Sequence, residues 1–180
     1  MKHSTLPILL KNQKILLIGG GNVALQKAQV LAENKMAFRI VSESLNKKIL
    51  KLTDNIDQKR FKLNDIKDEQ IIIDATGNPK VAQKLVKYKK SHPILLNVVD
   101  VPELCDFYFM ALTKNRPLQI AVSSNGASPT AAKYFRDECE RLIPKDITAY
   151  LNQKKQEREA GLIDVEQTKK ELAFQQTKVF

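Results

Sequence analysis

Residues 14–28 read KILLIGGGNVALQKA and predict a strand, a tight turn and a helix in succession. The apolar run before the glycines is typical of a buried parallel strand. Gly19 lets the chain leave that strand in a tight turn, Gly21 lets the backbone approach a pyrophosphate, and Ala24 lets helix and strand pack closely. The phosphates would lie on the free N–H groups at the start of the helix. With Gly20 between them, these residues predict a dinucleotide-binding turn.

Three further apolar runs stop at small or polar residues, as buried parallel strands do at the ligand-binding edge of an α/β sheet. They cover residues 37–44, 70–78 and 93–100. Because the carboxyl ends of parallel strands meet at one edge, we expect their last residues beside the glycine turn, namely Ser42, Glu43, Ser44, Thr76 and Asp100. The segments between them predict a short helix over 45–52, a short edge strand over 60–63 and a helix over 81–88. This alternation predicts an α/β fold with a Rossmann-like parallel sheet.

Two carboxylates in this set carry alternative interpretations. Glu43 follows the glycines by about 20 residues, the spacing at which such folds place an acid against the adenosine ribose. A carboxylate there would repel a 2′-phosphate, so this interpretation favours NAD over NADP. The same pattern is also typical of an exposed glutamate at a strand end. Asp100 is likewise either a functional carboxylate or the cap of a turn.

The second half of the chain departs from the alternation. Apolar runs at 107–112 and 118–123, separated by a polar turn, predict a hairpin. Ser128 as N-cap and Pro129 at the first helical position predict a helix that continues over 130–142. Beyond Pro144 the chain is helix-prone, rich in Lys, Glu and Gln, and sparse in apolar residues. Such a tail is a docking or dimerisation element at most.

Composition restricts the remaining possibilities. No apolar run approaches the roughly 18 residues of a membrane helix, and the N-terminus lacks a signal-peptide pattern, so we expect a cytoplasmic protein with no membrane partner. The two cysteines, Cys105 and Cys139, and two histidines, His3 and His92, lack the spacing of a zinc site or a disulfide framework. We therefore expect no metal site and treat both cysteines as packing residues.

The formal net charge of +10 requires an explanation in terms of partners. The basic residues are scattered among acidic ones and are not interleaved with aromatic residues, so we do not expect nucleic acid as the partner. A polyanionic small substrate and a merely solvated surface remain as alternatives, and composition alone favours the second.

Several short sequence motifs, taken in order over residues 5–145, resemble those of one protein family. They are Leu6-Pro7-Ile8, Ile18 to Ala24, Asn97-Val98-Val99-Asp100, Pro102 to Phe107, and Ala121 to Pro129. The combination of these motifs identifies a family much more specifically than any single motif does. The family is precorrin-2 dehydrogenase, the amino-terminal part of siroheme synthase.

This resemblance implies an NAD-dependent oxidation of precorrin-2, a tetrapyrrole, to sirohydrochlorin. Some members of the family also insert ferrous iron, and the family is homodimeric. It implies an NAD-binding domain at 1–112, a dimerisation segment at 113–145 and a helical C-terminal region at 146–180. The family's key aspartate falls on Asp100, and its cofactor contacts fall on Asn22, Val23, Glu43, Ser44 and Thr76. Asn97 and Ser124 are the expected substrate contacts.

The resemblance also changes the weight of the alternatives. The implied substrate is a tetrapyrrole ring that carries carboxylate side chains, so a cleft lined by Lys and Arg would account for the net charge.

Two departures from the family pattern are a shorter, more polar region after Pro144 and Met110 at a position where the family commonly has proline. The alternatives are a dehydrogenase that also inserts iron, a relative that only inserts iron or binds tetrapyrroles, and an NAD-sensing module without catalysis.

Overall fold

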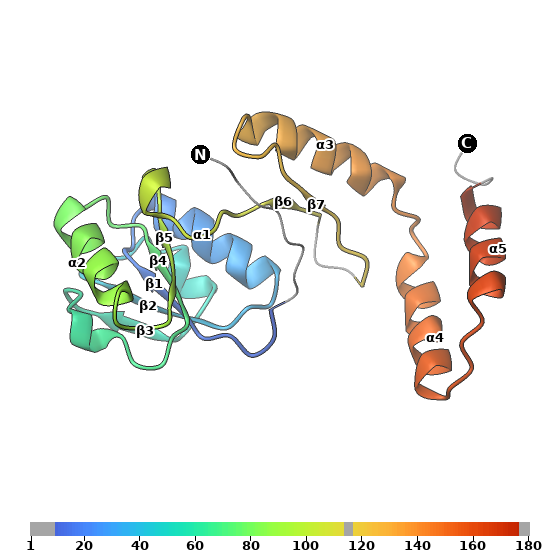
Figure 1. The fold of residues 1–180 in the computed structure, drawn as a ribbon, viewed down its shortest axis with the longest axis horizontal. Coiled ribbons are helices and arrows are strands. Elements are labelled where there is room, and N and C mark those ends of the chain that lie inside the picture. Colours follow the sequence, from blue (N-terminus) through green and yellow to red (C-terminus); the bar gives the residue numbers. More distant parts are fainter. Residues whose placement is uncertain (1–9, 114–116, 177–180) are drawn as a thin grey trace. The chain divides into compact units, whose positions relative to one another are not determined.

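The computed structural model describes residues 10–113 and 117–176 (Figure 1). The chain divides into two compact units between Phe109 and Met110, and each unit is described by itself. Two predicted features lie outside the described residues: the motif Leu6-Pro7-Ile8 and residues 114–116 of the hairpin turn. No helix in the described ranges has the length and apolar character needed to cross a membrane.

The first unit is built on a five-stranded parallel sheet, which confirms the α/β prediction. The strand order is β3-β2-β1-β4-β5. The strands are β1 (Ile15–Ile18), β2 (Phe38–Ser42), β3 (Ile56–Gln58), β4 (Ile71–Asp74) and β5 (Leu95–Val98). The predicted strand that precedes the glycines therefore lies at the centre of the sheet, with β2 and β4 as its neighbours.

Two apolar layers enclose this sheet. α1 (Asn22–Glu33) packs on one face and α2 (Pro79–Lys89) on the other. Because side chains alternate along a strand, Leu17 packs into the α1 layer and Leu16 into the α2 layer. Both are fully buried, and each contributes about 1.5–3 kcal/mol to the free energy of unfolding. Ala24, also fully buried, lets α1 approach the sheet as predicted.

Two short predicted elements differ from the structure. The edge strand predicted at 60–63 is wrong, because β3 occupies the edge and residues Leu63–Asp65 form a 3₁₀ turn. The Asp65 carboxylate accepts the Lys62 N–H at 2.7 Å, and the Asp65 N–H donates to the Lys62 carbonyl at 2.9 Å, so the local turn uses these polar groups. The helix predicted over 45–52 reduces to a 3₁₀ turn at Ile49–Lys51.

A buried charge network holds the loop that follows β3. Arg39 of β2 is 7% exposed and donates from Nε and Nη2 to one Glu69 carboxylate oxygen, at 2.8 and 2.6 Å. Its Nη1 donates to Asp57 at 2.6 Å. The other oxygen of Glu69 accepts the Lys67 N–H at 2.8 Å. The ions are thus paired and hydrogen-bonded, the condition under which buried charge is tolerated.

Replacing Glu69 with glutamine is expected to lower the free energy of unfolding by about 3 kcal/mol, because it leaves the buried Arg39 guanidinium with too little negative charge. Urea denaturation measures this loss. The control is Asp68→Asn, which removes an exposed ion pair with Lys14 and should cost less than about 1 kcal/mol. Equal losses in the two variants would contradict a structural role for the buried network.

The second unit contains the predicted hairpin and helices. β6 (Ala111–Leu112) and β7 (Ala121–Val122) pair antiparallel, so the hairpin is confirmed, with only two residues in each strand. The helices are α3 (Pro129–Leu142), α4 (Ile147–Glu159) and α5 (Val165–Gln176). Ser128 caps α3, since its side chain accepts the Ala131 N–H at 3.1 Å. Lys154 joins α4 to α5 by pairing with Glu171 at 2.8 Å.

Candidate functional site

The residues that follow four of the strands meet at the carboxyl edge of the sheet, as the sequence predicts. The Gly19 N–H donates to the Val41 carbonyl at 3.0 Å, and the Ala75 N–H donates to the Ile18 carbonyl at 2.8 Å. The Val99 N–H donates to the Asp74 carbonyl at 2.9 Å. The chain ends of β1, β2, β4 and β5 are therefore adjacent in space, and they bring together the predicted site residues of the first unit.

The three glycines of the turn differ in what the fold requires of them. Gly19 has φ +110°, and a Cβ there would lie 2.7 Å from the Ala75 carbonyl oxygen. A Cβ on Gly20 would collide with the Ser44 carbonyl oxygen. Gly21 has φ −77°, which any residue adopts, and a Cβ there would meet no atom of residues 10–113 and 117–176 within 4 Å. Protein contacts thus explain Gly19 and Gly20, whereas Gly21 borders open space.

This open space lies at the N-terminus of α1. Gly21 is the N-cap and has no side chain to accept the first N–H groups of the helix. The N–H groups of Asn22, Val23 and Ala24 have no acceptor within the helix, and the positive end of the helix dipole adds to their attraction for an anion. Asn22 and Val23 are exposed. The turn therefore fits a dinucleotide pyrophosphate, which the absence of a Cβ at Gly21 leaves room to bind.

The end of β2 carries the acidic residue predicted to contact a ribose. The Glu43 side chain is exposed. The Ser42 hydroxyl donates to the Ser44 carbonyl at 2.8 Å, and the Asn46 N–H donates to the Gly20 carbonyl at 2.7 Å. These bonds hold the segment after β2 against the glycine turn. The ribose contact itself stays a prediction.

Asp74, at the end of β4, is a residue that sequence reasoning missed. Its Oδ1 accepts both the Thr76 N–H, at 3.0 Å, and the Thr76 hydroxyl, at 2.6 Å. Asp74 is 2% exposed, and its Oδ2 has no hydrogen-bond partner among the described residues. Burial raises the pKa of this carboxyl, although the bonds from Thr76 oppose the shift. The sequence signal that could have identified Asp74 is an acidic residue directly after three isoleucines. Asp74 fixes the hydroxyl of Thr76, a predicted cofactor contact.

Asp100 lies in a tight turn at the end of β5. The Val101 N–H donates to the Val98 carbonyl at 3.1 Å and closes the turn. Asp100 is exposed and has φ +63°, in the left-handed region that favours glycine. Aspartate tolerates this region better than most residues, yet it still costs free energy. Strained residues of this kind cluster at functional sites.

The two predicted substrate contacts lie in different units. Asn97 is 5% exposed, and its Nδ2 donates to the Phe107 carbonyl at 2.8 Å. Its Oδ1 has no partner in the described part of the chain. Ser124 belongs to the second unit, where its hydroxyl accepts the Ser128 N–H at 2.8 Å. Both have defined structural contacts, and their contact with a substrate stays a prediction.

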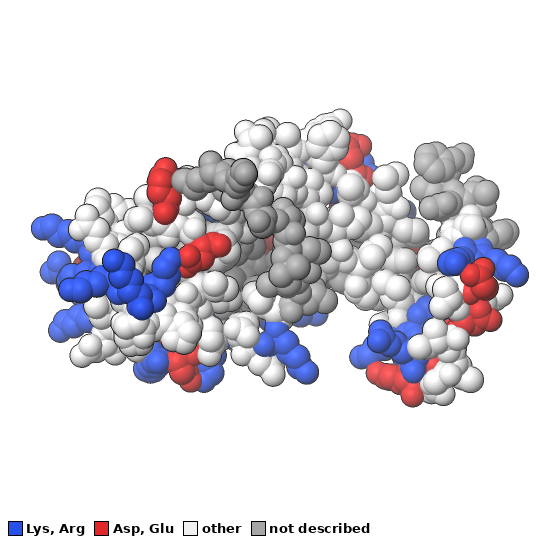
Figure 2. All heavy atoms as spheres, viewed as in Figure 1, with Lys and Arg blue, Asp and Glu red and all other residues white. Residues whose placement is uncertain are grey.

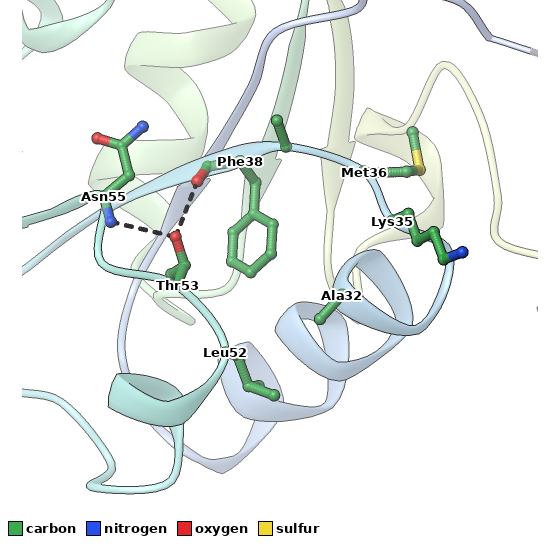
Figure 3. Close-up of a pocket in the computed structure, with 8 residues that line it drawn as sticks. Ala32, Lys35, Met36, Phe38, Leu52, Thr53 and Asn55 are labelled. Atoms are coloured by element: carbon green, nitrogen blue, oxygen red, sulfur yellow. Dashed lines mark hydrogen bonds between the residues drawn. The ribbon is translucent and has the colours of Figure 1, made fainter.

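A pocket of about 360 Å³ lies elsewhere, where the end of α1 meets the start of β2 (Figure 3). Phe38, Met36 and Leu52 form much of its lining. The Thr53 hydroxyl accepts the Asn55 N–H at 3.1 Å and lies 3.4 Å from the Phe38 carbonyl. The pocket adjoins the amino end of β2, opposite the glycine turn, and it contains none of the predicted site residues.

Basic side chains gather over the part of the first unit where α2 lies (Figure 2). α2 carries four lysines and no acidic residue. In the described ranges, no cluster of three or more His, Cys, Asp or Glu side chains is suited to hold a metal ion. The charge therefore gathers partly on an exposed helix face, and a polyanionic substrate and a solvated surface both remain as explanations.

An open glycine turn at a helix N-terminus, on the central strand of a 3-2-1-4-5 parallel sheet, defines a dinucleotide-binding α/β protein. Comparison with known proteins narrows this class. Residues 6–111 match the family described as "Putative NAD(P)-binding", and residues 115–142 match "Sirohaem biosynthesis protein central". The chain belongs to the siroheme synthase N-terminal family, in which an NAD(P)-binding domain precedes the central sirohaem synthase domain.

Two relatives illustrate the match. The chain is 33% identical over 150 residues to a siroheme synthase of Actinobacillus pleuropneumoniae serotype 3 (strain JL03), covering 80% of this chain and 31% of that protein. It is 36% identical over 145 residues to a siroheme synthase of Methylococcus capsulatus, covering 77% of this chain and 31% of that protein. The chain thus spans about a third of the length of these relatives.

A solved structure shares the fold. It is "SirC, precorrin-2 dehydrogenase", with a TM-score of 0.70, covering 83% of this chain and 76% of that chain. The sequence identity is 21%, so the match shows the fold alone.

Proposed function

We propose that this chain oxidises precorrin-2 to sirohydrochlorin with NAD as the oxidant. The observation that carries the proposal is the strained, exposed Asp100 at the carboxyl edge of the sheet that bears the open Gly21 turn. Membership in the siroheme synthase N-terminal family supports precorrin-2 as the substrate. A pure cofactor sensor would not need a strained carboxylate at a second strand end.

In this proposal the N–H groups of Asn22 and Val23 hold the pyrophosphate, Glu43 accepts hydrogen bonds from the ribose hydroxyls, and Thr76 contacts the cofactor from β4. NAD held by these residues would supply the acceptor for the hydride that a reduced carbon of the macrocycle loses. A proton leaves the substrate in the same net reaction. Asp100 either accepts that proton or orients a pyrrole N–H through a charge-assisted hydrogen bond.

The decisive assay is an anaerobic incubation of the purified chain with precorrin-2 and NAD. We expect the sirohydrochlorin absorbance to appear together with one NADH per product, and no change without NAD. A second arm supplies sirohydrochlorin and Fe²⁺ without NAD, and siroheme formed there would assign iron insertion to this chain as well. Absence of sirohydrochlorin and NADH in the first arm would contradict the dehydrogenase proposal. Absence of product in both arms would favour a cofactor-sensing role.

Replacing Glu43 with glutamine is expected to weaken discrimination against NADP, because the charge that repels a 2′-phosphate is removed. We expect the ratio of the Kd for NADP to the Kd for NAD to fall about tenfold, equivalent to about 1.4 kcal/mol. Fluorescence titration with each cofactor measures it. Glu33→Gln, at the other end of α1, is the control. An unchanged ratio would leave Glu43 as an exposed strand-end residue.

We also propose that the chain acts as a homodimer in the cytoplasm, with 113–145 as the dimerisation segment. Tyr134, Phe135 and Leu142 of α3 are each about 60% exposed, an apolar surface suited to a second copy. Cys105 and Cys139 are free thiols, as is usual in a reducing compartment. Light scattering coupled to gel filtration tests the dimer, and a monomeric mass would contradict it.

A further inference from the structure

The outer edge of β5 is closed by side chains of the segment that returns past it. β5 is an edge strand, so Leu96 and Val98 turn N–H and C=O groups away from the sheet. The Leu96 N–H donates to the Asp106 carboxylate at 2.9 Å, and the Asp106 N–H donates to the Leu96 carbonyl at 2.8 Å. The Val98 N–H donates to the Cys105 sulfur at 3.3 Å. Two consecutive side chains thus take the place of a sixth strand.

Cys105 also contacts both ends of the Asp100 turn. Its thiol donates to the Val98 carbonyl at 3.1 Å, and its sulfur lies 3.4 Å from the Val101 carbonyl oxygen. Burial raises the pKa of this thiol, so it keeps the proton that it donates. Val98 and Val101 are the residues whose hydrogen bond closes the turn. The thiol therefore holds the backbone immediately before and after Asp100.

Two more contacts fix the returning segment. The Tyr108 hydroxyl donates to the carbonyl of Pro102, one residue beyond the turn, at 2.9 Å. The second carboxylate oxygen of Asp106 accepts Lys89 Nζ, from the end of α2, at 2.6 Å. The segment 102–108 is thereby tied to both the turn and the sheet, and we call it the brace.

We propose that Cys105 and Tyr108 are positioning residues, which act through the brace to hold the Asp100 carboxylate in place for the reaction. The proposal rests on the proposed function. Its physical basis is that a left-handed aspartate has no intrinsic preference for this conformation, so surrounding contacts must impose it. Displacement of a catalytic group by about 1 Å can lower a rate about 100-fold.

Cys105→Ser and Cys105→Val form a matched pair that separates hydrogen bonding from packing. Serine keeps a donor and an acceptor at this position, whereas valine fills similar space and has neither. We expect kcat with precorrin-2 to fall about tenfold or more in Cys105→Val and to stay within about threefold of the unaltered chain in Cys105→Ser. Tyr108→Phe should lower kcat in the same direction. The Kd for NAD should be unchanged in all three.

Hydrogen exchange adds a readout that is independent of catalysis. The Val101 amide hydrogen closes the Asp100 turn, so we expect it to exchange about tenfold faster in Cys105→Val than in Cys105→Ser. Cys139→Ser, in the second unit, is the control and should leave this exchange unchanged. Equal kcat values in the serine and valine variants, or equal exchange at Val101, would overturn the positioning role.

The same experiment separates failure of this inference from failure of the proposed function. If the unaltered chain oxidises precorrin-2 but the two Cys105 variants have equal kcat values and equal exchange at Val101, the positioning role is wrong and the proposed function is retained. If the unaltered chain does not oxidise precorrin-2, the function falls, and the exchange of Val101 still decides whether Cys105 holds the turn.

Discussion

Asp100→Asn is expected to lower kcat for precorrin-2 oxidation about 100-fold or more, while the Kd for NAD changes by less than about threefold. Asparagine keeps the shape of the side chain and tolerates the left-handed backbone, but it cannot accept a proton or pair as an anion. Steady-state kinetics and cofactor titration measure the two effects. An unchanged kcat would contradict the role assigned to this carboxylate.

The left-handed φ of Asp100 makes the choice of substitution important. Asp100→Ala would lower the free energy of unfolding by about 1 kcal/mol, because alanine adopts this region poorly. Asp100→Gly relieves that cost but adds entropy to the unfolded chain, so we expect a net change within about 0.5 kcal/mol. If activity is lost in both the asparagine and glycine variants, which remain stably folded, the loss lies in the chemistry and not in the fold.

Gly21→Ser is expected to raise the Kd for NAD about tenfold or more, equivalent to about 1.4 kcal/mol, without loss of stability. The new Cβ and hydroxyl would occupy the open space at the start of α1, where the pyrophosphate is proposed to lie. Serine is also a favoured N-cap, so the free energy of unfolding should stay equal or rise by a few tenths of a kcal/mol. Calorimetric titration with NAD and urea denaturation measure these two quantities.

The adjacent glycine provides the matched control. A Cβ on Gly20 would collide with the Ser44 backbone and lie 2.8 Å from the Ser42 hydroxyl oxygen. We therefore expect Gly20→Ala to lower the free energy of unfolding by about 3 kcal/mol, as severe overpacking does. If Gly21→Ser bound NAD as tightly as the unaltered chain, the cofactor would not use this turn. If Gly21→Ser unfolded like Gly20→Ala, its open space would be in doubt.

The central part of the fold could be predicted because local pattern and tertiary environment agree there. The apolar run at 15–18 is short and is followed directly by three glycines, a pattern that favours a buried strand ending in a tight turn over a helix. Ser128 followed by Pro129 likewise marks the start of α3 from local chemistry alone. At 60–63 the local pattern was misleading, because the Asp65 carboxylate diverts the backbone into a turn.

The sequence predicts which residues lie at the candidate site, but it does not predict the contacts that hold them there. Strand ends converge by topology, so Glu43, Thr76 and Asp100 could be placed at one edge from the sequence. The left-handed φ of Asp100 and the burial of the Asp74 side chain depend on packing between segments, which no periodicity in the sequence reports. The sequence predicts Cys105 only as a packing residue, because its hydrogen bonds with Val98 form only when the chain folds back on β5.

The closure of β5 by Cys105 and Asp106 also bears on edge-to-edge pairing between sheets of different chains. An uncovered edge strand offers a row of free N–H and C=O groups on which another chain can assemble. Here the outward groups of Leu96 and Val98 are already occupied, and the opposite edge of the sheet is β3, only three residues long. The side chains that border the Asp100 turn therefore also leave the sheet little room to pair with a foreign strand.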